Sequence, residues 1–145
     1  MARKTIKLKD YLKIVEEALA SAAIIPGMLV EFQSTGKVRP HNTANGEFVT
    51  AFATEDEFQG KTIADAYAID TPVQIWIPQR GDNVYALLAP GQEVVIGDKL
   101  TSAGGGLLRK YASASADAGH IVGEAIEAVD NSESSNAARI MVRVA

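Results

Sequence analysis

One short run of residues has types and spacing that could bind phosphate. Gly60-Lys61-Thr62 matches the last three positions of a P-loop, the glycine-rich turn that holds a nucleotide phosphate. The place of the first glycine in that loop is taken by an acid, within the acidic run Glu55-Asp56-Glu57, which would repel a triphosphate. A P-loop also needs a buried strand before it and a helix after it, and the pattern here indicates neither. We therefore do not expect nucleotide binding.

Acid–base, nucleophilic and metal chemistry have residues available but not the required spacing. His41 and His120 are the only histidines, they are distant in sequence, and neither has a second histidine four residues away as in the helical zinc motif. The absence of cysteine removes thiolate nucleophiles, sulfur-ligated metals and disulfides. No nucleophile-elbow pattern is present. Carboxylates that could converge for hydrolysis are Glu55, Asp56, Glu57, Asp65 and Asp70. Because acidic runs are usually solvated, we expect no enzymatic activity, no cofactor and no metal.

Two further runs are better explained as turns than as binding motifs. Arg80-Gly81-Asp82 spells a cell-adhesion tripeptide, but Gly-Asp between strands is a common turn sequence. The run Gly104-Gly105-Gly106 lacks the spacing of a dinucleotide fingerprint. Glycine supplies the positive φ that tight turns need, so we predict a turn at Arg80-Gly81-Asp82 and a hairpin turn at the three glycines.

Charge is distributed unevenly along the chain. Residues 1–13 hold five of the 14 Lys and Arg and one of the 18 Asp and Glu, so the net charge of −4 divides into +4 and −8. Basic ends on acidic bodies are a form of interaction tail, although a solvated surface is an equally good explanation. The asymmetry favours docking over catalysis.

The elements that must position these residues fall into two classes. Apolar residues at helical spacing predict a helix from about Leu8 to Ala23, stopped by Pro26-Gly27. Its lysines crowd the helix start, an order that the helix dipole disfavours. Beyond it the apolar pattern has period two, with a hairpin about Ser34–Lys37 and strands at 73–77, 84–88, 107–111 and 140–144. The segment Ala53–Tyr67 alone could form one or two helical turns.

Composition limits the class of protein. At 145 residues, 47% hydrophobic and 22% charged, the chain is expected to fold as one domain rather than to be disordered. Its longest uncharged apolar run, Ala18–Val30, is too short and interrupted to span a bilayer, so we expect a soluble, unexported protein without a membrane partner. A sequence pI near 5.2 argues against a nucleic-acid partner.

Four stretches, in this order and spacing, resemble the head decoration, or capsid cement, proteins of tailed bacteriophages, in particular the lambda-like decoration proteins. Each stretch alone is only a strand-turn pattern, and together they cover most of the chain beyond Ile25. They are Pro26–Phe32 with Gly36–His41, Glu55–Thr62, Val84–Gln92 with Gly97-Asp98, and Ile121–Glu124 with Ala138–Arg143.

This resemblance implies a mainly β fold: a small β-barrel or β-tulip (β-clip-like) body at 26–145, preceded by a basic N-terminal arm and helix at 1–25. It implies a homotrimer on the outer surface of the virion, at three-fold positions of the expanded head, with the major capsid protein as partner. In lambda-like members the arm orders on the shell as a strand; the helix here departs from that pattern and leaves strand or helix docking open. The capsid-binding residues it implies are Arg3, Lys4, Ile6, Lys7, Leu8 and Lys9.

Two other functions compete with this prediction. The turn-rich Gly91–Leu100 segment is also similar to clip and lipoyl-like domains, which makes a small-ligand-binding β-barrel the main alternative. Lys99 and Lys110 are poor candidates for a lipoyl or biotinyl lysine because neither sits at a hairpin tip among short apolar residues. A hydrolase using the acidic cluster is the second alternative.

Overall fold

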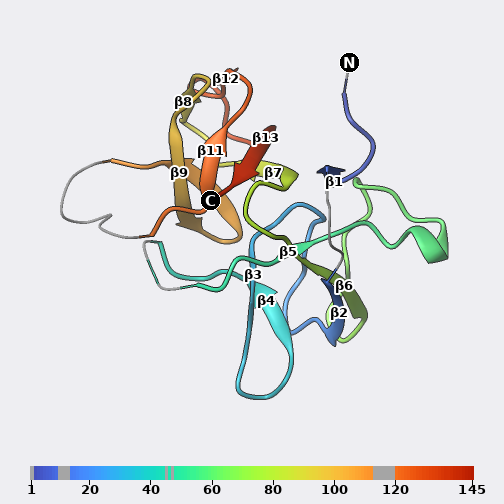
Figure 1. Cartoon of the computed structure of the whole chain (residues 1–145). Helices are drawn as coiled ribbons and strands as arrows, with labels where there is room; N and C mark the ends of the chain where they lie inside the picture. Colours follow the sequence, from blue (N-terminus) through green and yellow to red (C-terminus); the bar gives the residue numbers. More distant parts are fainter. Residues whose placement is uncertain (1, 10–13, 45, 47, 113–119) are drawn as a thin grey trace.

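In the computed structural model, the regular secondary structure of the described residues consists of short strands and one 3₁₀ turn, joined by loops (Figure 1). It describes residues 2–9, 14–44, 46, 48–112 and 120–145. The strands are β1 (Lys7–Lys9), β2 (Ile14–Leu19), β3 (Val30–Phe32), β4 (Val38–Pro40), β5 (Phe52–Ala53), β6 (Pro72–Ile77), β7 (Asn83–Leu88), β8 (Glu93–Val94), β9 (Lys99–Gly104), β10 (Leu107–Lys110), β11 (Gly123–Ala125), β12 (Val129–Asp130) and β13 (Ala138–Val144). The predicted mainly β class is confirmed.

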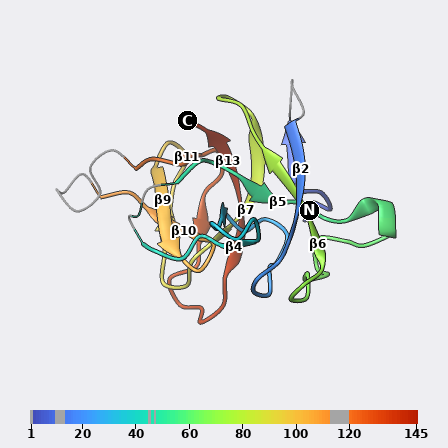
Figure 2. The same cartoon turned by 90° about the horizontal axis from the view of Figure 1, so that it is seen from below.

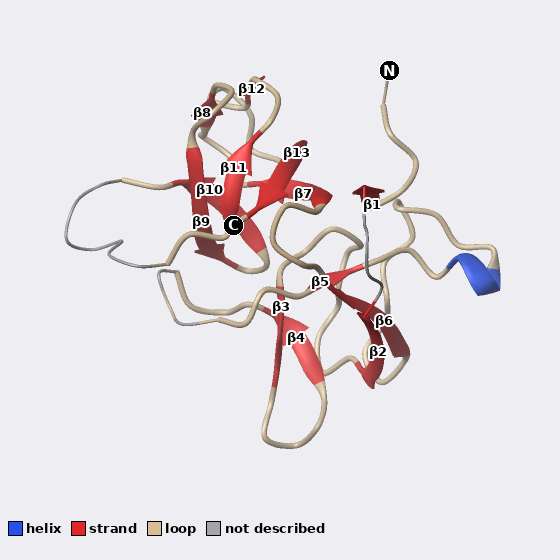
Figure 3. Ribbon diagram, in the orientation of Figure 1, coloured by secondary structure: helices blue, strands red, loops and turns tan. Residues whose placement is uncertain are grey.

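The largest sheet has the strand order β1-β7-β10-β9-β11-β13, and β7 also pairs with β13. The strands β7, β10, β9, β11 and β13 therefore form a closed ring of pairings, because β13 pairs with β7 again. The pair of β10 with β7 is parallel and joins Leu108 to Leu88. A second sheet has the order β2-β6-β5, and β3–β4 and β8–β12 form two-stranded ribbons. Figure 3 shows the large sheet and the β2-β6-β5 sheet on different sides of the molecule.

The helix predicted over Leu8–Ala23 is wrong. Residues 7–9 and 14–19 are strands, and the part of the chain that the structure describes contains only one helical turn, the 3₁₀ turn η1 (Glu57–Gln59). This turn lies within the Ala53–Tyr67 segment. Strand β2 pairs along its full length with β6, and this long-range pairing overrides the helical spacing of its apolar residues. The division of the chain at residue 25 stays a prediction; β1 and β2, on one side of it, pair with β7 and β6 on the other.

The hydrophobic core has two parts that follow the two sheets. The larger is built on the inward faces of the β7–β13 ring and includes Ile6, Leu29, Trp76, Leu88, Leu100, Leu108, Ile140 and Val142. The smaller lies beneath the β2-β6-β5 sheet and includes Ala20, Ile24, Val30, Val38, Val73 and Ile75. Trp76 and Ile75 are successive residues on β6, so this strand contributes one face to each part. The predicted alternation on β6 and β13 is confirmed at these positions.

The side chain of Arg139 joins three segments that are distant in sequence. Its Nη1 donates to the carbonyl of Pro26 at 2.5 Å and its Nη2 to the carbonyl of Ile63 at 2.9 Å. The guanidinium also lies 5.9 Å from the ring centre of Tyr85. Burial lowers the pKa of Arg139, because desolvation disfavours its charged form. These contacts fix the segments that lead into β3 and out of η1 against β13.

Candidate docking surfaces

The segment predicted to be a docking arm is packed into the body from Ile6 onward. The Ile6 side chain is fully buried in the larger core. Its N–H donates to Oε2 of Glu55 at 3.1 Å, and its carbonyl accepts from the N–H of Tyr85 at 2.8 Å. Lys7 and Leu8 are half-buried, and the backbones of Lys7 and Lys9 pair with Val84 and Asn83.

This N-terminal pairing keeps one register across both sheets. The residue numbers of partners add to 91 for Lys7 with Val84 and for each of the six β2–β6 pairs, from Ile14 with Ile77 to Leu19 with Pro72. Lys9 with Asn83 is shifted by one, where β1 has an irregularity. Strands β1 and β2 thus pair with β7 and β6 in nearly the same antiparallel register, although the two pairings belong to different sheets. Within the predicted arm, Lys7–Lys9 is a strand of the large sheet.

Arg3 and Lys4 of the predicted arm are exposed. With Thr5 they line a hollow of about 480 Å³ whose other wall includes Glu55, Glu57 and Lys61. Basic and acidic side chains therefore both line this hollow. The side chain of Lys9 lies outside the described part of the structure; of the other five predicted arm residues, Arg3 and Lys4 are the exposed ones, and the capsid-binding role of the set stays a prediction.

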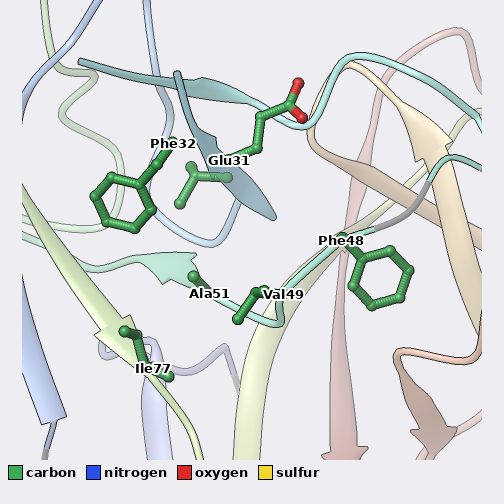
Figure 4. Close-up of a pocket in the computed structure, with 7 residues that line it drawn as sticks. Glu31, Phe32, Phe48, Val49, Ala51 and Ile77 are labelled. Atoms are coloured by element: carbon green, nitrogen blue, oxygen red, sulfur yellow. The ribbon is translucent and has the colours of Figure 1, made fainter. Parts of the chain in front are cut away.

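A second hollow is apolar and was not predicted from the sequence. Figure 4 shows Phe32, Val49 and Ile77 arranged around it, with Ala51 between the last two. Its volume is about 380 Å³, and Val30, Glu31 and Phe48 complete the lining. Val49 is 78% exposed and Phe32 47%. Large exposed apolar side chains that gather at one place mark interaction sites on soluble proteins.

Both faces of β2 carry exposed apolar side chains, and one face adjoins this apolar hollow. Ile14 pairs with Ile77 on that face and is 44% exposed. Val15 and Leu19 lie on the opposite face and are 46% and 44% exposed. In the sequence, Val15 and Leu19 belonged to the apolar stripe of the predicted helix. The run of β-branched residues at 14 and 15 was the signal that favoured a strand.

Three residue groups considered for chemistry have structural roles. Asp82 of the Arg80-Gly81-Asp82 run is fully buried and accepts the N–H of Gln79 at 2.8 Å, which confirms the turn interpretation. Gly60 ends η1 with a left-handed φ of 70°. His41 is buried, and its Nδ1 lies 2.6 Å from Oγ of Ser102, so this pair is closed to substrates in this conformation.

The predicted acidic cluster is divided among different contacts. Asp65 accepts from the N–H of Thr62 at 2.7 Å, which lowers the pKa of this carboxyl, and Asp70 pairs with Lys37 at 2.7 Å. Glu55 is buried toward Ile6. Within the described ranges, no group of three or more His, Asp or Glu side chains could hold a metal ion. No helix in those ranges is long and apolar enough to cross a membrane.

Burial also raises the pKa of a tyrosine near this acidic cluster. The hydroxyl of Tyr67 donates to the carbonyl of Thr54 at 2.6 Å. Desolvation raises its pKa to about 12, so the group stays protonated and keeps this hydrogen bond at physiological pH. Its role is to hold the chain after β5 against the segment before β6.

Comparison with known proteins adds one likeness of fold. No family model matches the chain. Among solved structures, the chain is similar to the crystal structure of the head fiber gp8.5 N base of bacteriophage phi29. The TM-score is 0.60 at 11% sequence identity, and the match covers 92% of this chain and 95% of the other. At this identity the likeness shows a shared fold, over almost the whole of both chains.

Proposed function

We propose that this chain is a capsid decoration protein of a tailed bacteriophage, which binds the outer surface of the expanded head and stabilises it. We further propose that it binds as a homotrimer at three-fold positions, with the major capsid protein as its partner. The observation that supports this proposal is the match in fold, over nearly the entire length of both chains, to a protein named as the base of a phage head fiber.

The surfaces of the molecule suit adhesion. The exposed apolar side chains gather around the hollow of Phe32 and Val49 and along β2, and exposed basic residues, Arg3 and Lys4, precede β1. A protein that binds only the assembled shell stabilises it by mass action, and symmetry multiplies each modest contact. Such a role requires complementary surfaces rather than a deep pocket. Enzymatic activity has no part in the proposal.

The direct test is to mix the purified protein with expanded heads that lack it, and to locate added density by electron microscopy. We expect density at three-fold positions, and light scattering shows whether the free protein is already trimeric. Heads that acquire no density at saturating protein would overturn the proposal. A monomer that retains a small molecule and ignores heads would favour the ligand-binding alternative.

The contribution of the basic residues needs substitutions rather than truncation. Deleting Met1–Lys9 removes Ile6 from the core and β1 from the sheet, so lost docking could follow from unfolding. Arg3→Glu with Lys4→Glu changes only exposed side chains and should lower head occupancy at moderate salt. Lys37→Glu with Arg80→Glu makes the same change in net charge elsewhere and serves as the matched control. Equal occupancy for both double variants would show that Arg3 and Lys4 are incidental.

A further inference from the structure

The outer edge of β2 is unpaired along the strand. β2 ends the order β2-β6-β5, and no described strand pairs with its other side between Ile14 and Leu19. Just beyond it, Ala20 forms a parallel bridge with Val38, and the N–H of Ser21 donates to the Val38 carbonyl at 2.8 Å. In Figures 1 and 2, β2 lies beside β6 at the margin of the molecule. The edge therefore stops where β4 begins to cover it.

The hydrogen bonds of β6 determine which groups of β2 face outward. The N–H of Thr54 donates to the carbonyl of Gln74, so residues 74 and 76 direct their backbone groups toward β5. Residues 73, 75 and 77 consequently face β2, where they pair with residues 18, 16 and 14. Val15, Glu17 and Leu19 must then direct their N–H groups to the open edge. Ser21, two residues further along, does donate outward, to Val38.

Apart from the charges of Glu16 and Glu17, the open edge lacks the devices that protect edge strands from pairing. Soluble proteins use proline, lysine, bulges or a covering loop at such positions. β2 has the sequence IVEEAL, pairs regularly with β6 and is exposed on both faces. Through the Ile14–Ile77 pair, one face is continuous with the apolar hollow. An exposed apolar strand with free backbone donors is a template for an added strand.

The other face of β2 provides charge that selects the added strand. Glu17 lies with Asp56 and Phe58 around a hollow of about 440 Å³, completed by Gln59, Pro72 and Gln74. The Phe58 ring is 85% exposed. Two carboxylates beside an open aromatic ring attract a cationic side chain through charge and through the ring face. Glu16, on the opposite face, adds a third carboxylate along the same strand.

We propose that the outer edge of β2 binds an extended segment of a partner protein by strand addition, with a Lys or Arg of that segment in the Glu17–Asp56–Phe58 hollow. The backbone groups of Val15 and Glu17 supply the pairing, and the carboxylates select basic over acidic segments. The inference rests on the proposed function only for the source of the segment, which would be the capsid protein.

A proline at an outward position tests the pairing without breaking β6. Glu17→Pro removes an outward N–H, which edge strands tolerate, whereas Glu17→Ala removes the same charge and keeps the N–H. The probe is an end-blocked hexapeptide of alternating valine and lysine, titrated into ¹⁵N-labelled protein. We expect saturable shifts of the amides of residues 14–19, weakened several-fold by Glu17→Ala and at least tenfold by Glu17→Pro. An equivalent valine–glutamate peptide should bind at least tenfold more weakly than the lysine peptide.

Three outcomes would overturn the inference: no saturable shift at 14–19, equal binding of both peptides, or a folded Glu17→Pro variant that binds as the unaltered protein does. Head binding separates this from the capsid proposal. Peptide binding without head binding would leave the β2 site standing and remove the capsid as its source. Heads that bind the Glu17→Pro protein normally, with no peptide binding, would leave the capsid proposal standing and remove the site.

Discussion

The backbone N–H of Ile6 donates a hydrogen bond to Oε2 of Glu55, 49 positions away in the sequence. Both residues are buried, so the carboxylate holds the N-terminal strand in place at the point where it enters the core. Ile6 was predicted to contact a capsid, and Glu55 was considered as a possible catalytic acid. The structure places them together in a contact that fixes the first strand of the fold.

Removing the Glu55 carboxylate should therefore destabilise the N-terminal strand. Glu55→Ala leaves the Ile6 N–H buried without an acceptor, at a cost of about 1–3 kcal/mol in the free energy of unfolding. Glu55→Gln keeps an acceptor oxygen and should cost less. Urea denaturation gives both values, and Glu57→Ala, at an exposed position, is the control expected within about 0.5 kcal/mol of the unaltered protein. Equal stability of the three variants would contradict the role of this bond.

Arg139 should contribute more to the free energy of unfolding than an ordinary surface arginine does. Arg139→Met keeps the length of the side chain but leaves the carbonyls of Pro26 and Ile63 without their donors, and we expect a loss of about 2–3 kcal/mol. Arg143→Met changes an exposed arginine on the same strand and should cost at most about 1 kcal/mol. Thermal or urea denaturation measures the difference. Similar losses for both variants would argue against the Arg139 contacts.

Both the backbone angle at position 27 and the atoms around it require a glycine there. The φ of Gly27 is 98°, and an added Cβ would lie 2.1 Å from Nη1 of Arg139 and 2.9 Å from the carbonyl oxygen of Tyr85. Gly36 has a similar φ of 83° but open space around it, which makes Gly36→Ala a matched control for the angle alone. We expect Gly36→Ala to lower the free energy of unfolding by about 1–2 kcal/mol and Gly27→Ala to lower it by clearly more. If the two losses were equal in chemical denaturation, the steric argument would be wrong.

The free energy of unfolding should decrease at low pH, because carboxylates on and beside the large sheet become protonated. A hydrogen bond from Lys99 lowers the pKa of Glu124 from its ordinary 4.5, and the Val95 N–H lowers that of Asp98 from 3.8. A lowered pKa in the folded state means that the unfolded chain binds the proton more tightly. The stabilisation is complete above the unfolded pKa values and is lost as pH falls through the folded ones. Urea midpoints should stay level from pH 7 to about 5 and then decline.

Lys99→Met isolates the Glu124 part of this acid dependence. Without the Lys99 partner the pKa of Glu124 rises toward its ordinary value, although Arg143 still lies 3.1 Å away. The variant should therefore lose less stability between pH 5 and pH 3 than the unaltered protein does. A parallel decline in both proteins would show that Glu124 contributes nothing to it.

Sequence pattern was sufficient where neighbours along the chain determine the structure. The Ser34–Lys37 turn joins β3 to β4, the three glycines from Gly104 join β9 to β10, and β13 buries Ile140, Val142 and Val144 as its alternation indicated. In each case the turn residues or the period of two are local. The resemblance to decoration proteins also led to the correct mainly β class.

The pattern failed where distant pairing decides the structure. Residues 14–19 fit a helical stripe, but their partner is β6, more than 50 positions away, and that pairing could not be read from local spacing. The disfavoured order of lysines and acids along the supposed helix was the available warning. The apolar hollow likewise combines Phe32, Val49 and Ile77 from three segments, so only the folded chain brings it together.

The pairing of β1 with β7 and of β2 with β6 has a consequence for how the chain acquires its structure. Because the partners stand 53 to 77 positions apart, the first strands must wait during synthesis until the middle of the chain has emerged. Closing such long loops is slow, so refolding in the test tube should proceed in milliseconds to seconds rather than microseconds. During that delay the segment from Ile14 to Leu19 has no strand to pair with. It is then most open to capture by other newly made chains, and fast synthesis at high concentration would favour aggregation.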